Sequence, residues 1–384
     1  MSKDLRSILR AHAARYPLMQ PADAVKLLYQ NEFGPGHSLP DAEAGCARLA
    51  CERAATAADA VQPAAESIGN GLVRLHLAAP AVRELSQETL FRCFAATARR
   101  TGSFASLEAK LSVLCALCDA GELPFGSGPL AAYLTEFRAS GCPAVSHSDA
   151  YRRAYRPAYR VAEAIYARFL PLLTRLDRLL AQGGRVVLAI DGRCGSGKTT
   201  LAALLSTLYC CAAVHMDDFF LPPALRTPER LAAPGGNVHY ERFLEEVAPR
   251  LRAGRAFTYR RFDCGRMALA GEVAVADAPL LLVEGSYALR PELRPCYDLS
   301  VFLTVSPEEQ RRRILARDGA EQLERFCTRW IPMEERYFAA CTVQADSDLV
   351  FRTDEGEDGA RLVSSGLRLC AGRGSDILAA GAGE

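Results

Sequence analysis

The ten residues from Asp191 to Thr200 constrain this chain most, because they fit a pattern that needs one particular local fold. They read D-G-R-C-G-S-G-K-T-T and contain G-x-x-x-x-G-K-[ST], whose glycines let backbone N–H groups curl around phosphate oxygens. The apolar run 185–190 before them is typical of a buried strand, and residues 201–208 after them have helical spacing. The sequence therefore predicts a strand, a phosphate-binding loop (P-loop) and a helix whose N-terminus points at the phosphates.

Nine consecutive residues of this stretch are expected to contact the phosphates of a nucleotide. They are Gly192, Arg193, Cys194, Gly195, Ser196, Gly197, Lys198, Thr199 and Thr200. Lys198 is the only lysine from residue 111 to the C-terminus, in a chain that otherwise uses arginine for positive charge. Arginine presents a planar fork whereas lysine is a compact point charge. A lysine retained here thus favours a narrow phosphate pocket over the alternative, a glycine turn beside a strand.

Composition narrows the class of protein. The chain has 384 residues, enough for two or three domains, and a formal charge of +1 from 46 basic and 45 acidic residues. This balance does not suggest a nucleic-acid or membrane partner. The N-terminus is charged, and no run approaches the roughly eighteen apolar residues of a membrane span. We therefore predict a soluble, cytoplasmic protein.

The 14 cysteines are scattered, mostly within apolar runs, as reduced small hydrophobic residues would be. Cys115 and Cys118 form the only C-x-x-C. This pair lies in a helical pattern and has no second pair at zinc-site spacing, which favours a helix over metal binding or redox chemistry.

Residues 1–180 are predicted to form a mostly helical N-terminal domain of unknown role. Helical spacing covers 5–12, 22–29, 42–53, 87–100, 106–118 and 162–180. Residues 68–77 alternate instead and predict a strand or a hairpin.

Two predicted loops of this domain, 31–39 and 141–159, carry residues suited to binding or catalysis. The first contains Glu32 and His37, and the second contains His147, Tyr151, Tyr155, Tyr159 and several arginines. A ligand site is one interpretation of each loop. The other is ordinary turn chemistry, with a helix that begins after Ser148.

Residues 181–184 form the predicted joint to a second domain, 181–355, and residues 356–384 a flexible tail. Strands are predicted at 212–216, 256–262, 279–284 and 299–305, a long loop at 221–236, and helices at 240–252 and after Ser306. Strands that alternate with helices indicate an α/β fold, here a parallel sheet of the P-loop NTPase type with helices on both faces. Ligands of such sheets bind beyond the carboxyl ends of the strands.

Phosphoryl transfer needs a phosphate cradle, Mg²⁺, an oriented nucleophile and positive charge. Thr199 is a candidate Mg²⁺ ligand, and Asp217 and Glu284, each at a strand end, complete the predicted metal site. Asp217 is also the best-placed base for a substrate hydroxyl. The alternative for Asp217 and Asp218 is a helix cap or a turn.

Four arginines lie on the predicted helix after Ser306. Arg313 and Arg317 are four residues apart and share a face, as a clamp over phosphates requires. For Arg311 and Arg312 a solvated surface is the preferred interpretation.

At this point the motifs resemble the uridine kinase and phosphoribulokinase group of P-loop kinases over roughly 183–353. The ordered set is G-R-C-G-S-G-K-T-T, H-M-D-D-F-F, G-G-N-V-H-Y-E-R-F, Y-R-R-F-D, L-V-E-G-S-Y, R-R-I-L-A-R-D and W-I-P-M-E-E-R-Y-F. The resemblance implies ATP, Mg²⁺ and transfer of the γ-phosphate to a primary hydroxyl. It also implies that Asp217 is the catalytic base, that Glu284 matches the carboxylate of the E-G strand end, and that Arg313 and Arg317 are lid arginines. Lys198 completes the predicted catalytic set.

The acceptor side departs from this group. His239 stands where similar nucleoside kinases carry the aspartate that holds the ribose, and Cys264 stands near the usual base-reading histidine. The predicted acceptor contacts are Phe219, His239, Tyr240, Tyr259 and Arg266. A nucleoside is the nearest acceptor, but Arg260, Arg261 and Arg266 equally favour an acidic or phosphorylated one.

Other hypotheses stay open. The P-loop could be a regulatory nucleotide switch for an activity in the N-terminal half, or that half could be a second enzyme acting in series. The predicted partners are ATP and a small-molecule hydroxyl acceptor, and the sequence decides neither for nor against a homo-oligomer.

Overall fold

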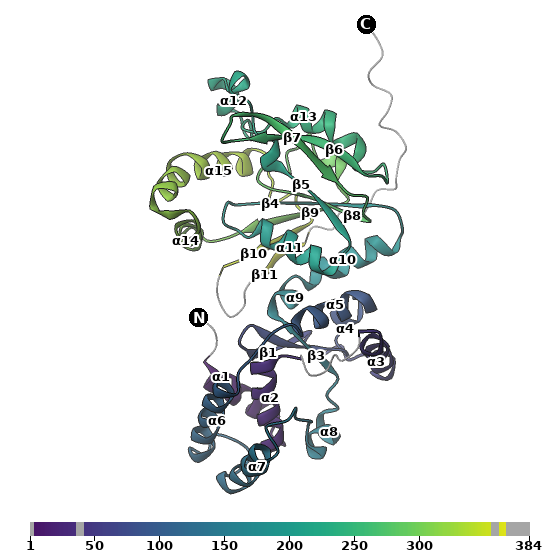
Figure 1. Cartoon of the computed structure of the whole chain (residues 1–384), viewed down its shortest axis with the longest axis vertical. Helices are drawn as coiled ribbons and strands as arrows, with labels where there is room; N and C mark the ends of the chain where they lie inside the picture. Colours follow the sequence, from purple (N-terminus) through teal and green to yellow (C-terminus); the bar gives the residue numbers. More distant parts are fainter. Residues whose placement is uncertain (1–3, 36–41, 355–360, 366–384) are drawn as a thin grey trace. The chain divides into compact units, whose positions relative to one another are not determined.

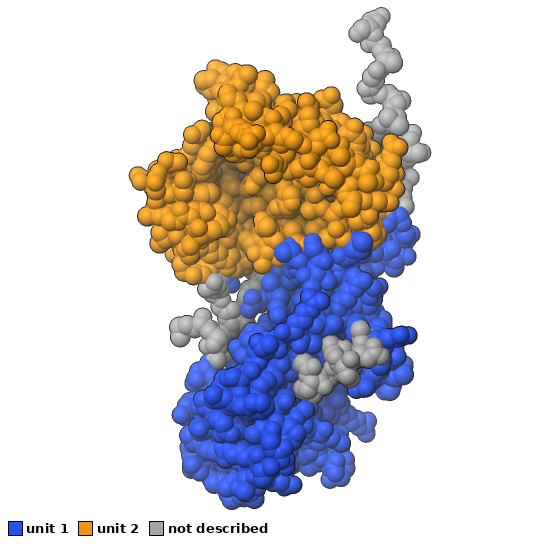
Figure 2. Space-filling view, in the orientation of Figure 1, with its two compact units in different colours: residues 1–184, 203–210, 354–361 blue, residues 185–202, 211–353, 362–384 orange. Residues whose placement is uncertain are grey.

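The computed structural model describes residues 4–35, 42–354 and 361–365. The chain divides into two compact units, which Figure 2 shows in blue and orange. Unit 1 comprises residues 1–184, 203–210 and 354–361, and unit 2 comprises residues 185–202, 211–353 and 362–384. Within the described ranges no helix has the length and apolar character needed to cross a membrane.

Unit 1 is mostly helical, with one small sheet (Figure 1). Its helices are α1 (Leu5–Arg15), α2 (Pro21–Phe33), α3 (Ala42–Ala55), α4 (Pro80–Arg83), α5 (Gln87–Thr97), α6 (Phe104–Asp119), α7 (Ser127–Ala139), α8 (Asp149–Tyr155), α9 (Ala164–Arg168) and α10 (Leu170–Ala181). The antiparallel sheet has the order β1 (Ala65–Gly69), β2 (Leu72–His76), β3 (Tyr159–Glu163).

The alternating stretch 68–77 forms a hairpin, one of the two predicted outcomes. Gly69 pairs with Leu72, and Asn70 and Gly71 between them have φ of 54° and 72°. Asn-Gly with positive φ at both positions is the turn whose twist matches antiparallel strands. The local sequence therefore sets the register of β1 and β2.

Three predictions for unit 1 need correction. The helix predicted over 162–180 is interrupted, because Tyr159–Glu163 pairs with β2 as a strand and α10 begins separately with Pro171 in its first turn. Helix α7 was not predicted, although Leu130, Leu134 and Phe137 follow helical spacing and are buried. The predicted loop 141–159 contains the helix α8. Ser148 caps this helix by accepting the Tyr151 N–H at 3.1 Å, which agrees with the interpretation that a helix begins after Ser148.

Unit 2 has the predicted α/β fold. Its elements are β4 (Val186–Gly192), the first part of α11 (Lys198–Leu208), β5 (Cys211–His215), α12 (Pro228–Ala232), α13 (Tyr240–Glu246), β6 (Phe257–Asp263), β7 (Ala268–Val275), β8 (Leu280–Glu284), β9 (Leu299–Thr304), α14 (Pro307–Arg325), α15 (Ile331–Ala340), β10 (Leu349–Arg352) and β11 (Arg361–Ser365). A 3-10 turn, Met216–Phe219, follows β5. The sheet order is β11-β10-β9-β4-β8-β5, and β10, β9, β4, β8 and β5 are parallel.

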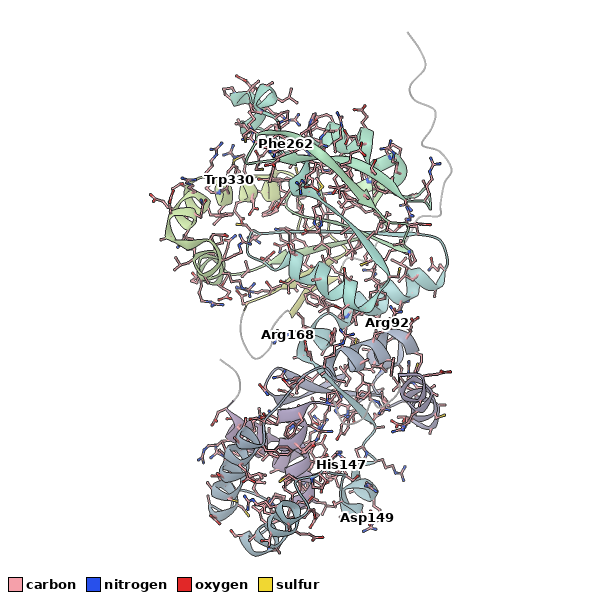
Figure 3. The ribbon with its side chains drawn as sticks, in the orientation of Figure 1. Arg92, His147, Asp149, Arg168, Phe262 and Trp330 are labelled. Carbon is pink, nitrogen blue, oxygen red and sulfur yellow. The ribbon has the colours of Figure 1, made fainter. Side chains whose placement is uncertain are left out.

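Several details of unit 2 differ from the predictions. Strand β6 pairs with the unpredicted β7 in a separate antiparallel hairpin, and Phe262 of β6, labelled in Figure 3, is buried there. The helix predicted to reach residue 252 ends at Glu246, and a 3-10 turn containing Pro249 follows. Strand β10 was also missed. Of the predicted tail, residues 361–365 form β11, and the rest lies outside the described residues.

The end of β4 is the most constrained point of unit 2. All residues of β4 are buried, and Gly192 has a φ of 146°. A Cβ at Gly192 would lie 2.1 Å from the Leu303 carbonyl oxygen on β9, so only glycine fits. The adjacent Asp191 is fully buried and accepts four hydrogen bonds. They come from the N–H groups of Gly192 (2.7 Å), Tyr287 (3.2 Å) and Leu289 (2.9 Å) and from the Tyr337 hydroxyl (2.8 Å).

Asp191→Asn is expected to destabilise the protein although its shape is conserved. Each carboxylate oxygen accepts two donors, so an amide NH₂ in either position leaves at least one buried backbone N–H unpaired. We expect the free energy of unfolding to fall by about 1–3 kcal/mol, measured by chemical denaturation. The control is Asp298→Asn, whose remaining oxygen can keep the Val187 N–H and which loses only a surface ion pair with Arg252, worth up to about 1 kcal/mol. Equal losses for both variants would contradict this assignment.

Candidate active site

Residues 193–197 form the loop that joins β4 to α11. Gly195 and Gly197 have φ of 72° and 94°, and the loop is fixed by bonds from the N–H of Arg193 to the Leu303 oxygen (3.1 Å) and from the N–H of Ser196 to the Arg193 oxygen (3.0 Å). Lys198 reaches back across the loop, with Nζ 2.7 Å from the Gly192 oxygen. The predicted strand–loop–helix arrangement is therefore present.

The side chains of this loop differ in how far they are exposed to solvent. Arg193 turns away to a bidentate ion pair with Glu335 (2.6 and 2.9 Å), and Cys194 and Ser196 are buried. In this conformation the side chains of these three predicted phosphate contacts are engaged or buried, and their N–H groups donate to Leu303, Glu334 and Arg193. The hydroxyl residues Thr199 and Thr200 are exposed at the start of α11.

Glu334 on α15 braces the loop, and sequence reasoning assigned it no role. Its carboxylate is 5% exposed and accepts the Cys194 N–H at 2.9 Å and the Ser286 hydroxyl at 2.6 Å. Lys198 Nζ lies 3.3 Å from the same Ser286 oxygen. One buried carboxylate thus holds the loop backbone and, through Ser286, the position of the lysine.

The predicted metal and base residues gather at the carboxyl ends of β5 and β8. His215 and Glu284 are register partners, and His215 Nδ1 lies 2.7 Å from Glu284 Oε1. This hydrogen bond raises the pKa of His215. Asp217 follows in the 3-10 turn, with its side chain open to solvent at one side.

The charges around Asp217 show which residues are brought together. Loss of hydration against the walls of the site raises the pKa of Asp217. Lys198 opposes this shift, whereas the negative charges of Glu284 and Asp218 add to it. The P-loop lysine and three carboxylates therefore lie within electrostatic reach of one another.

These residues fit a Mg²⁺ ion by their chemistry, because a hydroxyl from Thr199 and carboxylates from Asp217 and Glu284 are the hard oxygen ligands that Mg²⁺ prefers. Among the described residues no three His, Cys, Asp or Glu side chains are grouped as a metal site of their own. The donor set is thus suited to an ion that is shared with phosphate oxygens and water.

No family model matches the chain. It is 30% identical over 166 residues to a dephospho-CoA kinase from Rhodopseudomonas palustris, which covers 43% of this chain and 65% of that protein. Less than two thirds of that relative is therefore spanned. The resemblance to P-loop kinases is confirmed.

Two solved structures add to the comparison. A possible uridine kinase from Bacillus stearothermophilus is 23% identical and covers 49% of this chain and 98% of its own, with a TM-score of 0.38. A D-glycerate 3-kinase from Cryptococcus neoformans is 15% identical and covers 52% of this chain and 98% of its own, with a TM-score of 0.37.

On the acceptor side of this P-loop kinase-like unit, two predicted contacts lie in the core. Phe219 and Tyr259 are 0% and 2% exposed, and their rings stack with centroids 5.2 Å apart. The Tyr259 hydroxyl donates to Asp218 at 2.7 Å. In this structure Tyr259 holds Asp218, and neither aromatic residue is exposed enough for direct contact with an acceptor.

The other predicted acceptor contacts remain at least partly accessible. His239 is half-buried and begins α13, and Tyr240 is covered in part by Arg230 and Arg290, whose guanidinium carbons lie 4.7 and 4.0 Å from its ring centre. Arg266 lies in the turn between β6 and β7 and is 78% exposed. Cys264 in the same turn is close enough to Asp217 and Asp218 for their charges to raise its pKa, in addition to the larger effect of its burial.

The two predicted lid arginines, Arg313 and Arg317, differ in their contacts and in their exposure. Arg313 already has protein partners: Glu309 at 2.7 Å, the Gly195 oxygen at 3.1 Å, and Thr353. Arg317 is 60% exposed and pairs only with its neighbour Asp318 among the contacts that the structure describes. Asp217 adds to the raised pKa of Arg317, after the larger effect of Asp318, so this side chain lies within electrostatic reach of the predicted base. Gly319, two residues on, breaks the helix with a φ of 81°.

In unit 1, Glu32 has a structural role. It accepts hydrogen bonds from Lys110, Ser103 and Ser106 (2.5–2.7 Å), which lowers the pKa of the carboxylate against the opposing effect of burial. His37 lies outside the described residues. Cys115 and Cys118 lie on α6 as free thiols, as the helical interpretation expected.

Glu334→Ala is expected to disturb both stability and nucleotide binding. It leaves the buried Cys194 N–H without an acceptor, so the free energy of unfolding should fall by about 1–3 kcal/mol and ATP affinity should fall with it, by calorimetry. The matched control is the neighbouring Glu335→Ala, which removes a carboxylate that is 43% exposed and should change stability by less than about 1 kcal/mol. Unchanged ATP affinity in Glu334→Ala would exclude the bracing role.

Proposed function

We propose that unit 2 is an ATP-dependent kinase that transfers the γ-phosphate to a hydroxyl group of a small molecule, most simply a nucleoside. The observation that carries the proposal is the placement of Asp217 at the carboxyl edge of the sheet, where the charges of Lys198, Glu284 and Asp218 all act on it. A phosphate cradle, a carboxylate base and oxygen ligands for Mg²⁺ within one edge are the parts that phosphoryl transfer needs.

In this proposal the loop backbone and Lys198 bind the β- and γ-phosphates, and Mg²⁺, when bound, neutralises charge that develops on them. Asp217 accepts the proton of the acceptor hydroxyl, and its raised pKa makes it a better base than an ordinary aspartate. Arg317, which is exposed and pairs only with Asp318 among the described contacts, is the better of the two lid candidates to swing over the γ-phosphate. Arg313 supports the loop through the Gly195 oxygen.

The acceptor is proposed at the level of a hydroxylated small molecule that enters beside the β6–β7 turn. The case for an acidic acceptor is weaker than the sequence suggested, because Arg260, although 54% exposed, is already paired with Glu246. Asp218, held by Tyr259, can accept a second hydroxyl of a sugar-like acceptor. These features favour a nucleoside or another polyhydroxylated acceptor.

Asp217→Asn separates a kinase from a nucleotide switch. With a panel of uridine, cytidine, other nucleosides, dephospho-CoA, pantothenate, glycerate and sugar phosphates, we expect ATP-dependent turnover of at least one acceptor. The variant should lose about 10²–10⁴-fold in rate while binding ATP nearly as well as the wild type. Tight ATP binding without turnover of any acceptor would favour the regulatory switch. Equal loss of binding and turnover in the variant would remove Asp217 from the role of base.

The pH dependence tests the electrostatic argument. Asp217 acts as a base only when ionised, so kcat/KM should fall as the pH drops through its raised pKa, at higher pH than for an ordinary aspartate. Because the negative charge of Asp218 helps to raise this pKa, Asp218→Asn should lower it and move the acidic limb of the profile to lower pH. A limb that stays in place or moves upward in Asp218→Asn would contradict the assignment. Asp263→Asn in the β6–β7 hairpin is the control.

A further inference from the structure

Unit 1 contains a pocket that the proposed kinase chemistry does not use. Its volume is about 800 Å³, and residues from α1, β1, β2, α8 and β3 line it. The polar lining includes Arg15, Tyr16, Glu66, Arg74, His76 and Tyr159. A pocket of this size is within the range that accommodates a small metabolite.

Three buried polar atoms have no hydrogen-bond partners among the described residues, and two of them belong to the lining residues Glu66 and His76. They are His12 Nδ1, Glu66 Oε2 and His76 Nε2, in residues that are 3%, 8% and 6% exposed. Both histidine nitrogens lie 3.9 Å from the same Glu66 oxygen. Buried polar groups are nearly always hydrogen-bonded, so three at one point indicate a missing partner.

The protonation states of His12 and His76 indicate what kind of group that partner is. Burial lowers the pKa of His12 and lowers that of His76 to about 4, so both rings are neutral near pH 7. His12 Nε2 lies 3.0 Å from the Ser67 carbonyl oxygen and must carry the proton, which leaves Nδ1 as an acceptor. Glu66 Oε2 is an acceptor as well. The missing partner therefore has to donate hydrogen bonds, as the hydroxyl groups of a sugar do.

A cation is a poorer partner for these atoms. Arg74 is 2% exposed, its Nη1 lies 3.7 Å from Glu66 Oε2, and its charge contributes to the lowered pKa of both histidines. An ammonium group or a metal ion would be repelled by this guanidinium, whereas a neutral hydroxyl would not.

Aromatic rings form much of the wall. The ring of Tyr16 lies 5.1 Å from that of Tyr151 and 5.0 Å from that of Tyr155, between ring centres. Tyr159 forms another part, with the Arg74 guanidinium 4.6 Å from its ring centre. Flat apolar faces beside hydrogen-bonding side chains suit a sugar ring, which is apolar on its faces and polar at its edge.

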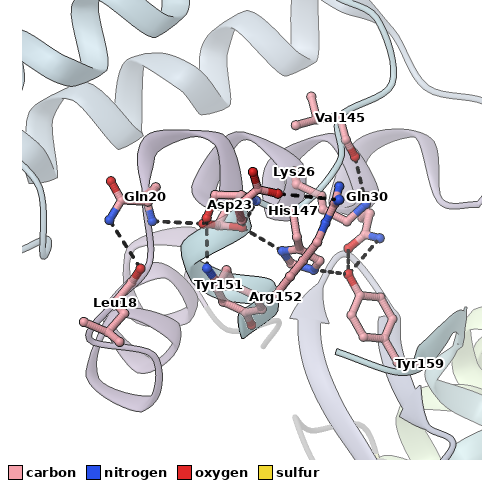
Figure 4. A network of polar contacts seen from close by, with 12 residues as sticks. Leu18, Gln20, Asp23, Lys26, Gln30, Val145, His147, Tyr151, Arg152 and Tyr159 are labelled. Carbon is pink, nitrogen blue, oxygen red and sulfur yellow. Dashed lines mark hydrogen bonds and ion pairs between the residues drawn. The ribbon is translucent and has the colours of Figure 1, made fainter. Parts of the chain in front are cut away.

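A hydrogen-bonded chain fixes this wall, as Figure 4 shows. Asp23 Oδ1 lies 2.8 Å from His147 Nδ1, and His147 Nε2 lies 2.7 Å from the Tyr159 hydroxyl. Burial lowers the pKa of His147 to about 4, so the neutral ring donates to Asp23 and accepts from Tyr159. Gln30 holds Arg74 through two hydrogen bonds to its Oε1 (3.1 and 2.9 Å). The wall is thus rigid before any ligand binds, which reduces the entropy lost on binding.

The mouth of the pocket carries positive charge. Arg15 at the end of α1 is 42% exposed and its Nε lies 3.5 Å from Glu66 Oε1, and Arg156 is exposed just after α8. Arg156 has a φ of 43° as the left-handed cap of α8, a conformation that is uncommon for a residue other than glycine. Against the lining carboxylates of Asp59 and Glu66, the three lining arginines leave a net positive charge. An anionic group on the ligand is therefore favoured at the mouth.

We propose that this pocket binds a sugar phosphate, with the sugar hydroxyls toward Glu66 and His76 and the phosphate at Arg15 and Arg156. The proposal does not depend on the function proposed for unit 2. It assigns a ligand site to the segments around His147 and Tyr159, for which the sequence left a ligand site and turn chemistry as alternatives.

The test is binding to the full chain by calorimetry. The probes are ribose 5-phosphate, fructose 6-phosphate and glycerol 3-phosphate, with free ribose and inorganic phosphate for comparison, all in the presence of saturating ADP to fill the P-loop. At least one sugar phosphate should bind at least about tenfold more tightly than either ribose or phosphate. Absence of binding by all three sugar phosphates would overturn the proposal.

Variants assign the binding to this pocket. Arg15→Ala, on the surface and expected to fold, should weaken the best sugar phosphate about tenfold. Arg10→Ala is the matched control, because Arg10 lies on the same helix, is 49% exposed and pairs with Glu122. Glu66→Gln should weaken ribose and its phosphate alike. Equal affinity in the wild type, Arg15→Ala and Arg10→Ala, or equal weakening by both arginine variants, would show that binding occurs elsewhere.

Discussion

The buried carboxylate of Asp191 is the interaction on which the rest of unit 2 depends. It collects donors from three separate parts of the chain: the strand end itself, the segment after β8, and Tyr337 on α15. Burial raises its pKa to about 6, and its hydrogen bonds to the backbone and to Tyr337 oppose that shift. A carboxylate placed here fixes where β4 ends, and so where the P-loop begins, relative to the two segments that supply Ser286 and Glu334. The position of Lys198 follows from these contacts rather than from the loop sequence alone.

This arrangement explains why the late helix α15 matters to a motif more than a hundred residues earlier. Helix α15 places Tyr337 on Asp191, Glu334 on the Cys194 N–H and Glu335 on Arg193. The P-loop and the strand residue before it are therefore held from the protein side by three contacts from one helix. Its outer side, with Thr199 and Thr200, is left open. Such one-sided bracing keeps the loop N–H groups oriented without occupying the space that phosphates need.

The sequence predicted the parts of unit 2 whose signals are local. The apolar runs that became β4, β5, β8 and β9, the P-loop, and the Ser306 cap each depend on neighbouring residues only. It missed β7, which has mixed polarity and lies in a hairpin, and β10, whose apolar run is only three residues long. It gave Glu334 no role, because the value of that carboxylate depends on a partner 140 residues away. Likewise Phe219 and Tyr259 were expected to contact an acceptor, whereas packing against Phe243 and Asp218 decides that they are buried.

The buried polar residues of the unit 1 pocket are also hard to predict from sequence, because they do not stabilise the fold in an obvious way. Arg74 is buried without a carboxylate at hydrogen-bond distance, and its main partners are an amide oxygen and an aromatic face. Removing a guanidinium from water costs several kcal/mol, which such partners offset only in part. Two neutral histidines and a carboxylate oxygen without partners add to that cost. Such a cluster is expected to lower the stability of the free protein, and in our proposal the ligand offsets part of that cost. That cost, more than the size of the pocket, argues that the pocket of unit 1 is shaped for a ligand.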